Sequence, residues 1–429
     1  MKHHSVCALG IIVTSLLAAC SSAKNDAADG GPGGGGGNDG GVDGAVGTDG
    51  GVDGSSGNDA GTDGTAPGND GGVGLTSCAN ATLYAGNPYF TGTLGGWNPA
   101  GQDKLADPPL RNETLAVSGQ TVYVDTNFEI WRTQGTQVLR VAGDENEPDS
   151  QYNPTGTCAA ARFLSIKGVA VLPNGNVIVN DVRGNGLVEL QSPTGTCMAA
   201  PYAGNQAKTL DTDITGEVAS PGDVDGPGAT AKFDGIGLPT VDAQGNVYIV
   251  DAGNTKIKKI ANDAAHTVST LFKYGSVDQP LPLSMTALNG KLYVAVGTVT
   301  NDILWEIDTQ SGTQKVLYSG RGIYPNIDPS AEAVINAMTN DGTSLIVGSN
   351  KGYLYKVGLD GTVKATLAGM GPFADFPTGL DLKNPIASAS LPLTSIGINN
   401  GSIVKVGNDI LWAGVAGGVG FYVWGIHCQ

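Results

Sequence analysis

A short β-rich run recurs six times in this chain, and it constrains the fold more than any other feature. The runs read TVYVD, NVIVND, NVYIVD, KLYVAV, SLIVGS and DILWAG, and they begin at residues 121, 176, 246, 291, 344 and 409. Self-similarity at a spacing of tens of residues is the signature of a repeat architecture, in which neighbouring units bury one another's apolar faces.

The clearest unit surrounds the third run. An apolar stretch ends at Asp242, a Gly-Asn turn follows at residues 245–246, and the β-rich run 247–250 comes next. An alternating run at 256–260 and a further β-rich run at 267–272 complete the unit. Short apolar runs separated by turn residues predict four antiparallel strands, so we expect six units of four strands each.

The two ends of the chain complement each other. A residue pair ending in glycine marks the end of each outer strand. It is a small residue and glycine at 142–143, 203–204, 319–320 and 368–369, and Tyr-Gly at 274–275. A sixth copy, Ala85-Gly86, precedes the first complete unit, whereas the last unit stops after its third strand at Ile426. The sequence therefore predicts an all-β fold, a six-bladed β-propeller of four-stranded blades whose last blade is closed by the N-terminal strand 79–85.

Two of the units resemble the NHL repeat, and the resemblance fades in the other four. The matching segments are Ala231-Lys232-Phe233, Gly245 to Asp251 and Ile257 to Ile260 in one unit, and Ala161-Arg162-Phe163, Gly168 to Val171 and Gly175 to Asp181 in the other. The NHL resemblance implies a propeller, most often with six blades, which agrees with the independent count of runs.

The first twenty residues have the features of an export signal, with Lys2, an apolar stretch from Val6 to Leu17, and small residues before Cys20. This spacing resembles the bacterial lipoprotein signal, which implies removal of residues 1–19 and lipidation of Cys20. Ser21 stands where an Asp would retain the protein at the inner membrane, so we expect a lipid anchor in the outer membrane, facing the periplasm or the cell surface. A plain secretory signal is the alternative.

Residues 20–77 are expected to be the lipidated cysteine followed by a disordered linker. Residues 21–77 contain 21 Gly and 9 Asp and almost nothing apolar to bury. The propeller then occupies residues 78–429. Its net charge is −10, whereas the whole chain carries −17. A negative charge of this size argues against nucleic-acid binding, and we expect a monomer that meets the membrane only through its N-terminal lipid.

Four cysteines remain in the predicted propeller, and an exported protein can oxidise them. Cys428 ends the third strand of the last blade and Cys78 begins the strand that completes this blade, so this pair is expected to staple the ring. The chain-entropy model gives such a long loop a stabilisation on the order of 4–5 kcal/mol. Cys158 and Cys197 pair by elimination, although the blade layout places them on opposite faces.

Polar residues at the ends of the second strands are the candidate metal ligands. Asn180, Asp181, Asp251 and Asn254 offer the oxygen atoms that Ca²⁺ prefers. Calcium-dependent lactonases of related shape use such ligands around a central channel. The alternative is that Asp181 and Asp251 bind backbone amides of turns. Histidine-based zinc chemistry is hard to build, because the predicted propeller contains only two histidines.

Recognition of another molecule is the function that these features favour. Long unequal connections, at 86–112, 144–160, 205–235 and 369–392, join fourth strands to first strands and are expected on one face. Loops on a rigid scaffold commonly bind partners, and Trp97 is a candidate contact for one. We therefore expect a membrane-anchored lipoprotein that binds a protein or a glycan and needs no cofactor. A calcium-dependent lactonase-like hydrolase and a structural envelope component are the alternatives.

Overall fold

The computed structural model describes the following residues of the chain, to which every statement below refers: 74–86, 114–125, 128–134, 137–144, 153–204, 208–210, 217–219, 221–275, 281–297, 302–320, 335–369, 385–390, 402–416 and 420–429. Cys20, Trp97 and the predicted leader lie outside these residues, as does the predicted linker as far as residue 73. These expectations remain predictions.

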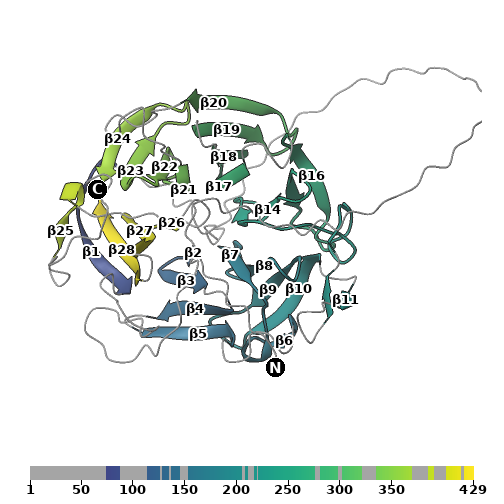
Figure 1. Ribbon diagram of the computed structural model, residues 1–429. Coiled ribbons are helices and arrows are strands. Elements are labelled where there is room, and N and C mark those ends of the chain that lie inside the picture. Colours follow the sequence, from purple (N-terminus) through teal and green to yellow (C-terminus); the bar gives the residue numbers. More distant parts are fainter. Residues whose placement is uncertain are drawn as a thin grey trace, which may run out of the picture. The chain divides into compact units, whose positions relative to one another are not determined.

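Six antiparallel sheets form the blades of a propeller, as the sequence predicts (Figure 1). The first three blades are β2 (Leu115–Ser118), β3 (Thr121–Asp125), β4 (Glu129–Gln134), β5 (Gln137–Gly143); β7 (Ile166–Val171), β8 (Val177–Asp181), β9 (Gly186–Gln191), β10 (Met198–Gly204); and β13 (Thr240–Val241), β14 (Val247–Asp251), β15 (Lys256–Ile260), β16 (Val268–Lys273). The fourth and fifth blades are β17 (Leu281–Leu288), β18 (Lys291–Gly297), β19 (Asp302–Asp308), β20 (Gln314–Gly320); and β21 (Ile335–Asn340), β22 (Leu345–Ser349), β23 (Tyr353–Val357), β24 (Val363–Ala368). A separate small hairpin consists of β11 (Lys208–Leu210) and β12 (Glu217–Ala219).

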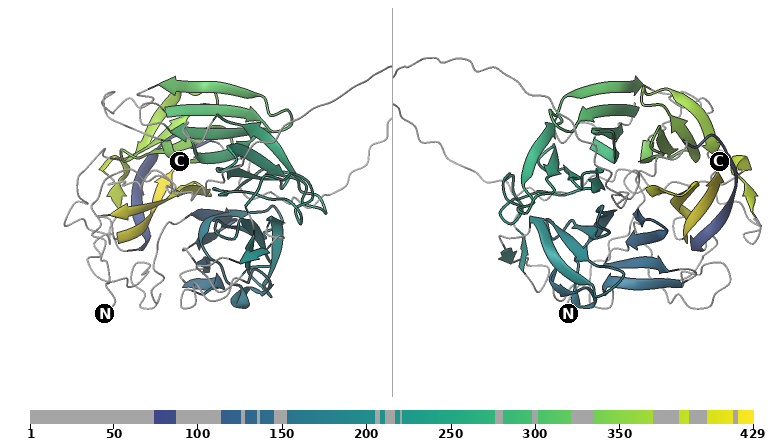
Figure 2. Two further views of the ribbon diagram at one scale, coloured as in Figure 1. Left: turned by 45° about the vertical axis from the view of Figure 1, so that its right-hand side comes forward. Right: turned by 180° about the vertical axis from the view of Figure 1, so that it is seen from behind.

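The sixth blade closes the ring with strands from both ends of the chain. It consists of β26 (Ser402–Val406), β27 (Asp409–Ala416), β28 (Gly420–Cys428) and β1 (Cys78–Gly86). β1 runs antiparallel to β28, with Cys78 opposite Cys428 and Ala81 opposite Ile426. Figure 2 shows β1 in purple beside the yellow C-terminal strands. The predicted exchange of strands is confirmed.

The segment before β1 belongs to the folded ring as well. Leu75 is fully buried in the core shared by the fifth and sixth blades. Its backbone N–H donates to Asp341 Oδ2 over 2.9 Å, and its carbonyl accepts a hydrogen bond from the Lys356 ammonium. The ordered fold therefore begins at least three residues earlier than residue 78, the start that the sequence predicts.

Glycine at the ends of the outer strands has a steric cause. Gly143 and Gly369 have φ angles of +87° and +108°, a region that side chains strongly disfavour. A Cβ atom at Gly143 would lie 2.1 Å from the carbonyl oxygen of Phe128, and one at Gly369 would lie 2.1 Å from that of Gly352. The recurring small-residue and glycine pair therefore marks the place where the outer strand passes close to the backbone preceding the third strand.

Two blades gain a short fifth strand, which resolves the geometric objection to the second disulfide. β6 (Gly156–Thr157) pairs with β10, and β25 (Ile386–Ala387) pairs with β1. Because β6 lies along the outer edge of its own blade, Cys158 N donates to Cys197 O over 3.1 Å. The structure contains both expected disulfides, Cys78–Cys428 and Cys158–Cys197.

The helical segments of the described residues are two 3-10 turns that follow the fifth strands. They are η1 (Cys158–Ala160) and η2 (Ser388–Ser390), which pack against outer strands β5 and β24 of the preceding blades. No helix in the described part of the chain is long and apolar enough to cross a membrane.

Side chains packed between neighbouring blades form the core. Trp412 and Trp424 are fully buried in the cluster that joins the last two blades. Gly348 of β22 faces the Trp412 ring so closely that an added Cβ would lie 2.4 Å from it. Such close packing fixes the angle between blades and holds the inner strands around the axis of the ring.

Candidate functional site

The six inner strands surround a central cavity of about 570 Å³. Its wall consists of residues 114–120, 169–171, 173, 238–244, 284–290, 338–340, 402–405 and 407. Every blade contributes to this wall through its first strand or the turn that follows it. Small-molecule sites in proteins commonly have volumes between about 300 and 1,000 Å³, so the cavity has the size of a ligand site.

Neutral polar side chains dominate the hydrogen-bonding groups of this wall. The hydroxyl side chains are those of Thr114, Ser118, Thr240, Ser284, Thr286, Thr339 and Ser402, and the amide side chains are those of Gln120, Gln244, Asn289 and Asn340. Apolar residues such as Met285 and Met338 lie between them. The wall therefore offers dispersed donors and acceptors together with apolar surface.

Several of these hydroxyl groups also link neighbouring blades. Ser402 Oγ accepts from Leu115 N over 2.9 Å, and Thr286 Oγ1 accepts from Asn340 Nδ2 over 2.8 Å. In these bonds the serine and threonine act as acceptors, so their own O–H groups remain for a further acceptor. Two hydroxyl groups of the wall, in the fourth and sixth blades, are thus held in place by these bonds.

Only two of the described wall residues carry a formal charge, Asp242 and Lys405. The Asp242 carboxylate accepts from Gln244 N, Asn246 N, Asn246 Nδ2 and Tyr248 Oη over 2.7–3.0 Å. Its four bonds hold the turn between β13 and β14. Lys405 is partly exposed in β26, and its side chain has no ion pair or hydrogen bond with the described residues.

A buried carboxyl lies beside this wall at the end of β3. Asp125 is fully buried, and its Oδ1 accepts from the backbone N–H and the hydroxyl of Thr114, the latter over 2.9 Å. Its Oδ2 has no hydrogen-bond partner among the described residues. Burial raises the pKa of Asp125 to about 7, although Thr114 and the charge of Lys167 oppose the shift. Burial also lowers the pKa of Lys167.

We expect Asp125→Asn to stabilise the protein at pH 8 by about 2 kcal/mol and to have little effect near pH 4. The folded-state pKa of Asp125 lies above the unfolded value, so the folded state holds an extra proton between about pH 4 and 7. Wild-type stability therefore falls as pH rises through this window, and movement of Lys167 toward the ionised carboxylate offsets part of the loss. Urea unfolding of both proteins at several pH values measures the difference in free energy of unfolding. The same difference at pH 4 and at pH 8 would contradict this prediction.

Two of the candidate metal ligands, Asn180 and Asp181, are buried at the end of β8 and bind backbone groups. Asp181 accepts from Leu164 N, Ser165 N and Gly184 N over 2.8–3.1 Å. Burial raises its pKa and these bonds oppose the shift. The Asn180 amide donates to the carbonyls of Ile236 and Gly237 in the next blade.

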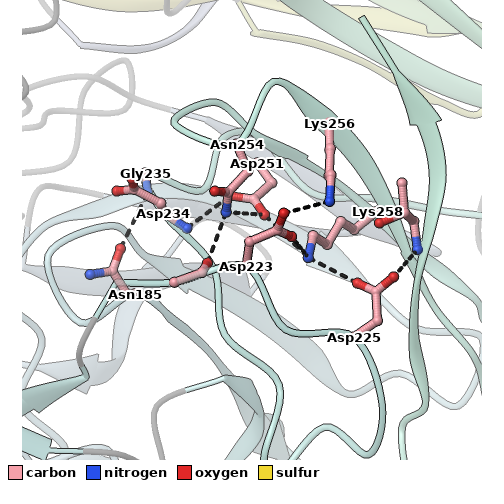
Figure 3. A network of polar contacts seen from close by, with 11 residues as sticks. Asn185, Asp223, Asp225, Asp234, Gly235, Asp251, Asn254, Lys256 and Lys258 are labelled. Carbon is pink, nitrogen blue, oxygen red and sulfur yellow. Dashed lines mark hydrogen bonds and ion pairs between the residues drawn. The ribbon is translucent and has the colours of Figure 1, made fainter. Parts of the chain in front are cut away.

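The other two candidates, Asp251 and Asn254, belong to a polar network in the third blade (Figure 3). Asp251 Oδ1 accepts from Asp234 N over 2.8 Å, and its Oδ2 accepts from Asn254 Nδ2 over 2.9 Å. Burial raises the pKa of Asp251. Asn254 also donates to the carbonyl of Gly222. Both side chains therefore hold the connection that leads into this blade.

The ammonium of Lys258 lies at the centre of this network. Its Nζ is 2.8 Å from Asp223 Oδ1, 2.9 Å from Asp225 Oδ1 and 3.5 Å from Asp251 Oδ2. The Lys258 side chain is fully buried; burial alone would lower its pKa, but the carboxylates outweigh it and the pKa is raised. A lysine thus supplies, among three carboxylates, the positive charge that a metal ion would otherwise bring.

The four candidate ligands are divided between two networks that fix connections of neighbouring blades. Within the described ranges, no group of three or more His, Cys, Asp or Glu side chains is arranged to hold a metal ion. Sequence reasoning did not single out Asp125, although it ends the run TVYVD as Asp251 ends NVYIVD. Nor did it single out Lys405, because the inner strands lack a distinctive pattern.

No family model and no curated protein matches this sequence. Among solved structures, it is similar to auxiliary nutrient binding proteins from Bacteroides ovatus and Bacteroides thetaiotaomicron, with TM-scores of 0.52 and 0.51 and identities of 9% and 10%. Each alignment covers 82% of this chain, and 78% and 77% of theirs. Virginiamycin B lyase from Staphylococcus aureus aligns over 82% of this chain and 97% of its own, with a TM-score of 0.41 and 11% identity. At these identities the two Bacteroides likenesses show a shared overall fold and assign no activity.

Proposed function

We propose that this protein is an extracytoplasmic binding protein that captures a glycan in the central cavity of its propeller. The single observation that carries this proposal is the cavity wall. All six blades contribute to it, and most hydrogen-bonding side chains of its described residues are hydroxyls and amides. Glycans present many hydroxyl groups, each able to donate and accept, and dispersed neutral partners match that pattern.

The fold of the two Bacteroides proteins is consistent with this role. Both are described as auxiliary nutrient binding proteins, and both have TM-scores above 0.5 to this chain. Their likeness shows that a scaffold of this shape occurs in proteins that bind nutrients. It supports the proposal, whereas the choice of a glycan rests on the wall of this cavity.

Two disulfides support a location outside the cytoplasm. Cys78–Cys428 and Cys158–Cys197 both join segments that meet only in the folded ring. Structural disulfides form and persist in oxidising compartments. We further propose that lipidated Cys20 anchors the chain to the outer membrane, and that the Gly-rich and Asp-rich segment after it serves as a flexible tether.

A calorimetric titration of the full chain with neutral and acidic mono- and disaccharides tests the proposed function. We expect at least one sugar to bind with a Kd below about 1 mM. Thr339→Trp places a large ring in the cavity wall and is expected to weaken this binding at least tenfold. The matched control is Val316→Trp, which adds the same ring to an outer strand where Val316 is 50% exposed.

Two results would contradict the proposal. The first is the absence of binding to every sugar, which favours the structural envelope component. The second is unchanged binding in Thr339→Trp, which would place the site outside the cavity. Calcium-dependent turnover of a lactone by the wild-type chain would favour the hydrolase alternative.

A further inference from the structure

We propose that the glycan captured in the cavity is acidic, and that its carboxylate pairs with the ammonium of Lys405. This inference rests on the proposed function and specifies the chemical class of the ligand. The inference is argued from the two charged side chains of the cavity wall. Asp242 and Lys405 are the charged residues among the described wall residues, and they differ in what they already bind.

The position of Lys405 follows from the alternation of β26. Ile403 packs with Trp412 in the core between the last two blades. Lys405 is two residues further along and therefore lies on the same face of the strand, toward the turn that follows it. It lines the cavity and is partly exposed. We therefore place its ammonium within reach of a ligand in the cavity.

The carboxylates of the cavity wall and of the strands next to β26 already have partners. Asp242 binds four donors within its own turn. Asp341, which follows the neighbouring inner strand β21, accepts from Leu75 N and lies 3.2 Å from the ammonium of Lys356. It also accepts from Thr343 and from Ser344 N. Asp409, across the turn that follows β26, lies 3.1 Å from His427 Nδ1. Lys405 has no ion pair with a described carboxylate, whereas Lys258, Lys356 and Lys364 each pair with at least one.

The negative net charge of the protein repels an anionic ligand, whereas the ammonium of Lys405 attracts it. The distances over which the two forces act decide which is stronger at the site. The folded part carries a net charge of −10. At physiological ionic strength, exposed charges more than about 8 Å apart are largely screened. A carboxylate in contact with Lys405 lies within that distance and is partly shielded from water. The local attraction therefore exceeds the diffuse repulsion at the site, while the repulsion acts mainly on the rate of approach.

The surroundings of Lys405 favour a single carboxylate over a phosphate group. The described wall residues include one cation, and the fixed hydroxyl donors of Ser402 and Thr286 are neutral. A phosphate monoester carries close to two charges and is usually held by several cations or a nest of amides. One ammonium with scattered hydroxyls matches the one charge and many hydroxyls of a uronic acid.

Paired titrations of uronic acids and their parent hexoses test this inference. Galacturonate and glucuronate serve as the acidic probes, galactose and glucose as the neutral ones, and disaccharides of each extend the set. We expect the best acidic probe to bind wild type at least fivefold more tightly than its neutral parent. Lys405→Met keeps the aliphatic stem and removes the charge, so we expect it to reduce this preference to less than twofold.

A second lysine provides the matched control. Lys364→Met removes the same charge from outer strand β24, where Lys364 pairs with Asp360 at 3.2 Å, and is expected to leave the preference unchanged. Equal binding of acidic and neutral probes, or a preference that survives Lys405→Met, would overturn the inference while the proposed function stands. If no probe binds, both fail.

Discussion

Lys258→Met is expected to lower the free energy of unfolding by about 3 kcal/mol. Removing one partner from a buried ion pair leaves uncompensated charge, which typically costs about 3–5 kcal/mol. Asp251 is fully buried, whereas the Asp223 and Asp225 side chains are about 40% exposed. Because water can solvate these two carboxylates, we expect a loss at the low end of that range. Urea unfolding at pH 7 measures the loss.

A neighbouring lysine controls for the general effect of removing a charge from this strand. Lys256 also pairs with Asp223, but it has no ion pair with a second carboxylate among the described residues and is partly exposed. We expect Lys256→Met to cost less than about 1 kcal/mol, as is usual for ion pairs near the surface. Equal losses in the two variants would mean that the network around Lys258 contributes no more than a single ion pair.

Breaking the ring-closing disulfide is expected to have the largest effect on the stability of the fold. Cys78–Cys428 closes a loop with a sequence separation of 350, whereas Cys158–Cys197 closes one of 39. In the chain-entropy model the stabilisation grows with the logarithm of loop length, so the two bonds differ by about 2 kcal/mol. Cys428→Ser should therefore lower the melting temperature by several degrees, and by more than Cys158→Ser.

The comparison between the two cysteine variants isolates ring closure from the general loss of a disulfide. Each variant removes one bond and leaves the other intact. Differential scanning calorimetry of wild type and both variants at one protein concentration gives the order of stability. Equal melting temperatures in all three proteins, or a larger loss in Cys158→Ser, would contradict a stapling role for Cys78–Cys428.

The fold followed from the sequence because each blade repeats a local pattern. All six predicted second-strand runs form β strands, from β3 to β27, and the N-terminal strand completes the last blade. Turn residues and β-rich runs are local signals. Ring closure followed from a count of strands, since the last unit lacked one and residues 79–85 supplied it. Neither inference needed the position of any side chain.

The roles of single side chains depend on contacts between residues distant in the sequence, which no local pattern reveals. Lys258 lies in the alternating run KIKKI, and its neighbours in the sequence give no sign that three carboxylates lie around its ammonium. Two of the backbone partners of Asp181 are amides 16 and 17 residues earlier in the chain. The cavity wall combines the inner strands of six blades, and one of them, β13, has only two residues.

A crystal structure of the full chain with the tightest-binding sugar of the titration series tests the central claim most directly. The account predicts the sugar within the central cavity, with ring hydroxyls in hydrogen-bond distance of Ser402 and Thr286 and, for an acidic sugar, its carboxylate against Lys405. A sugar bound to the outer strands or to the connections between blades, with the cavity wall untouched, would contradict it.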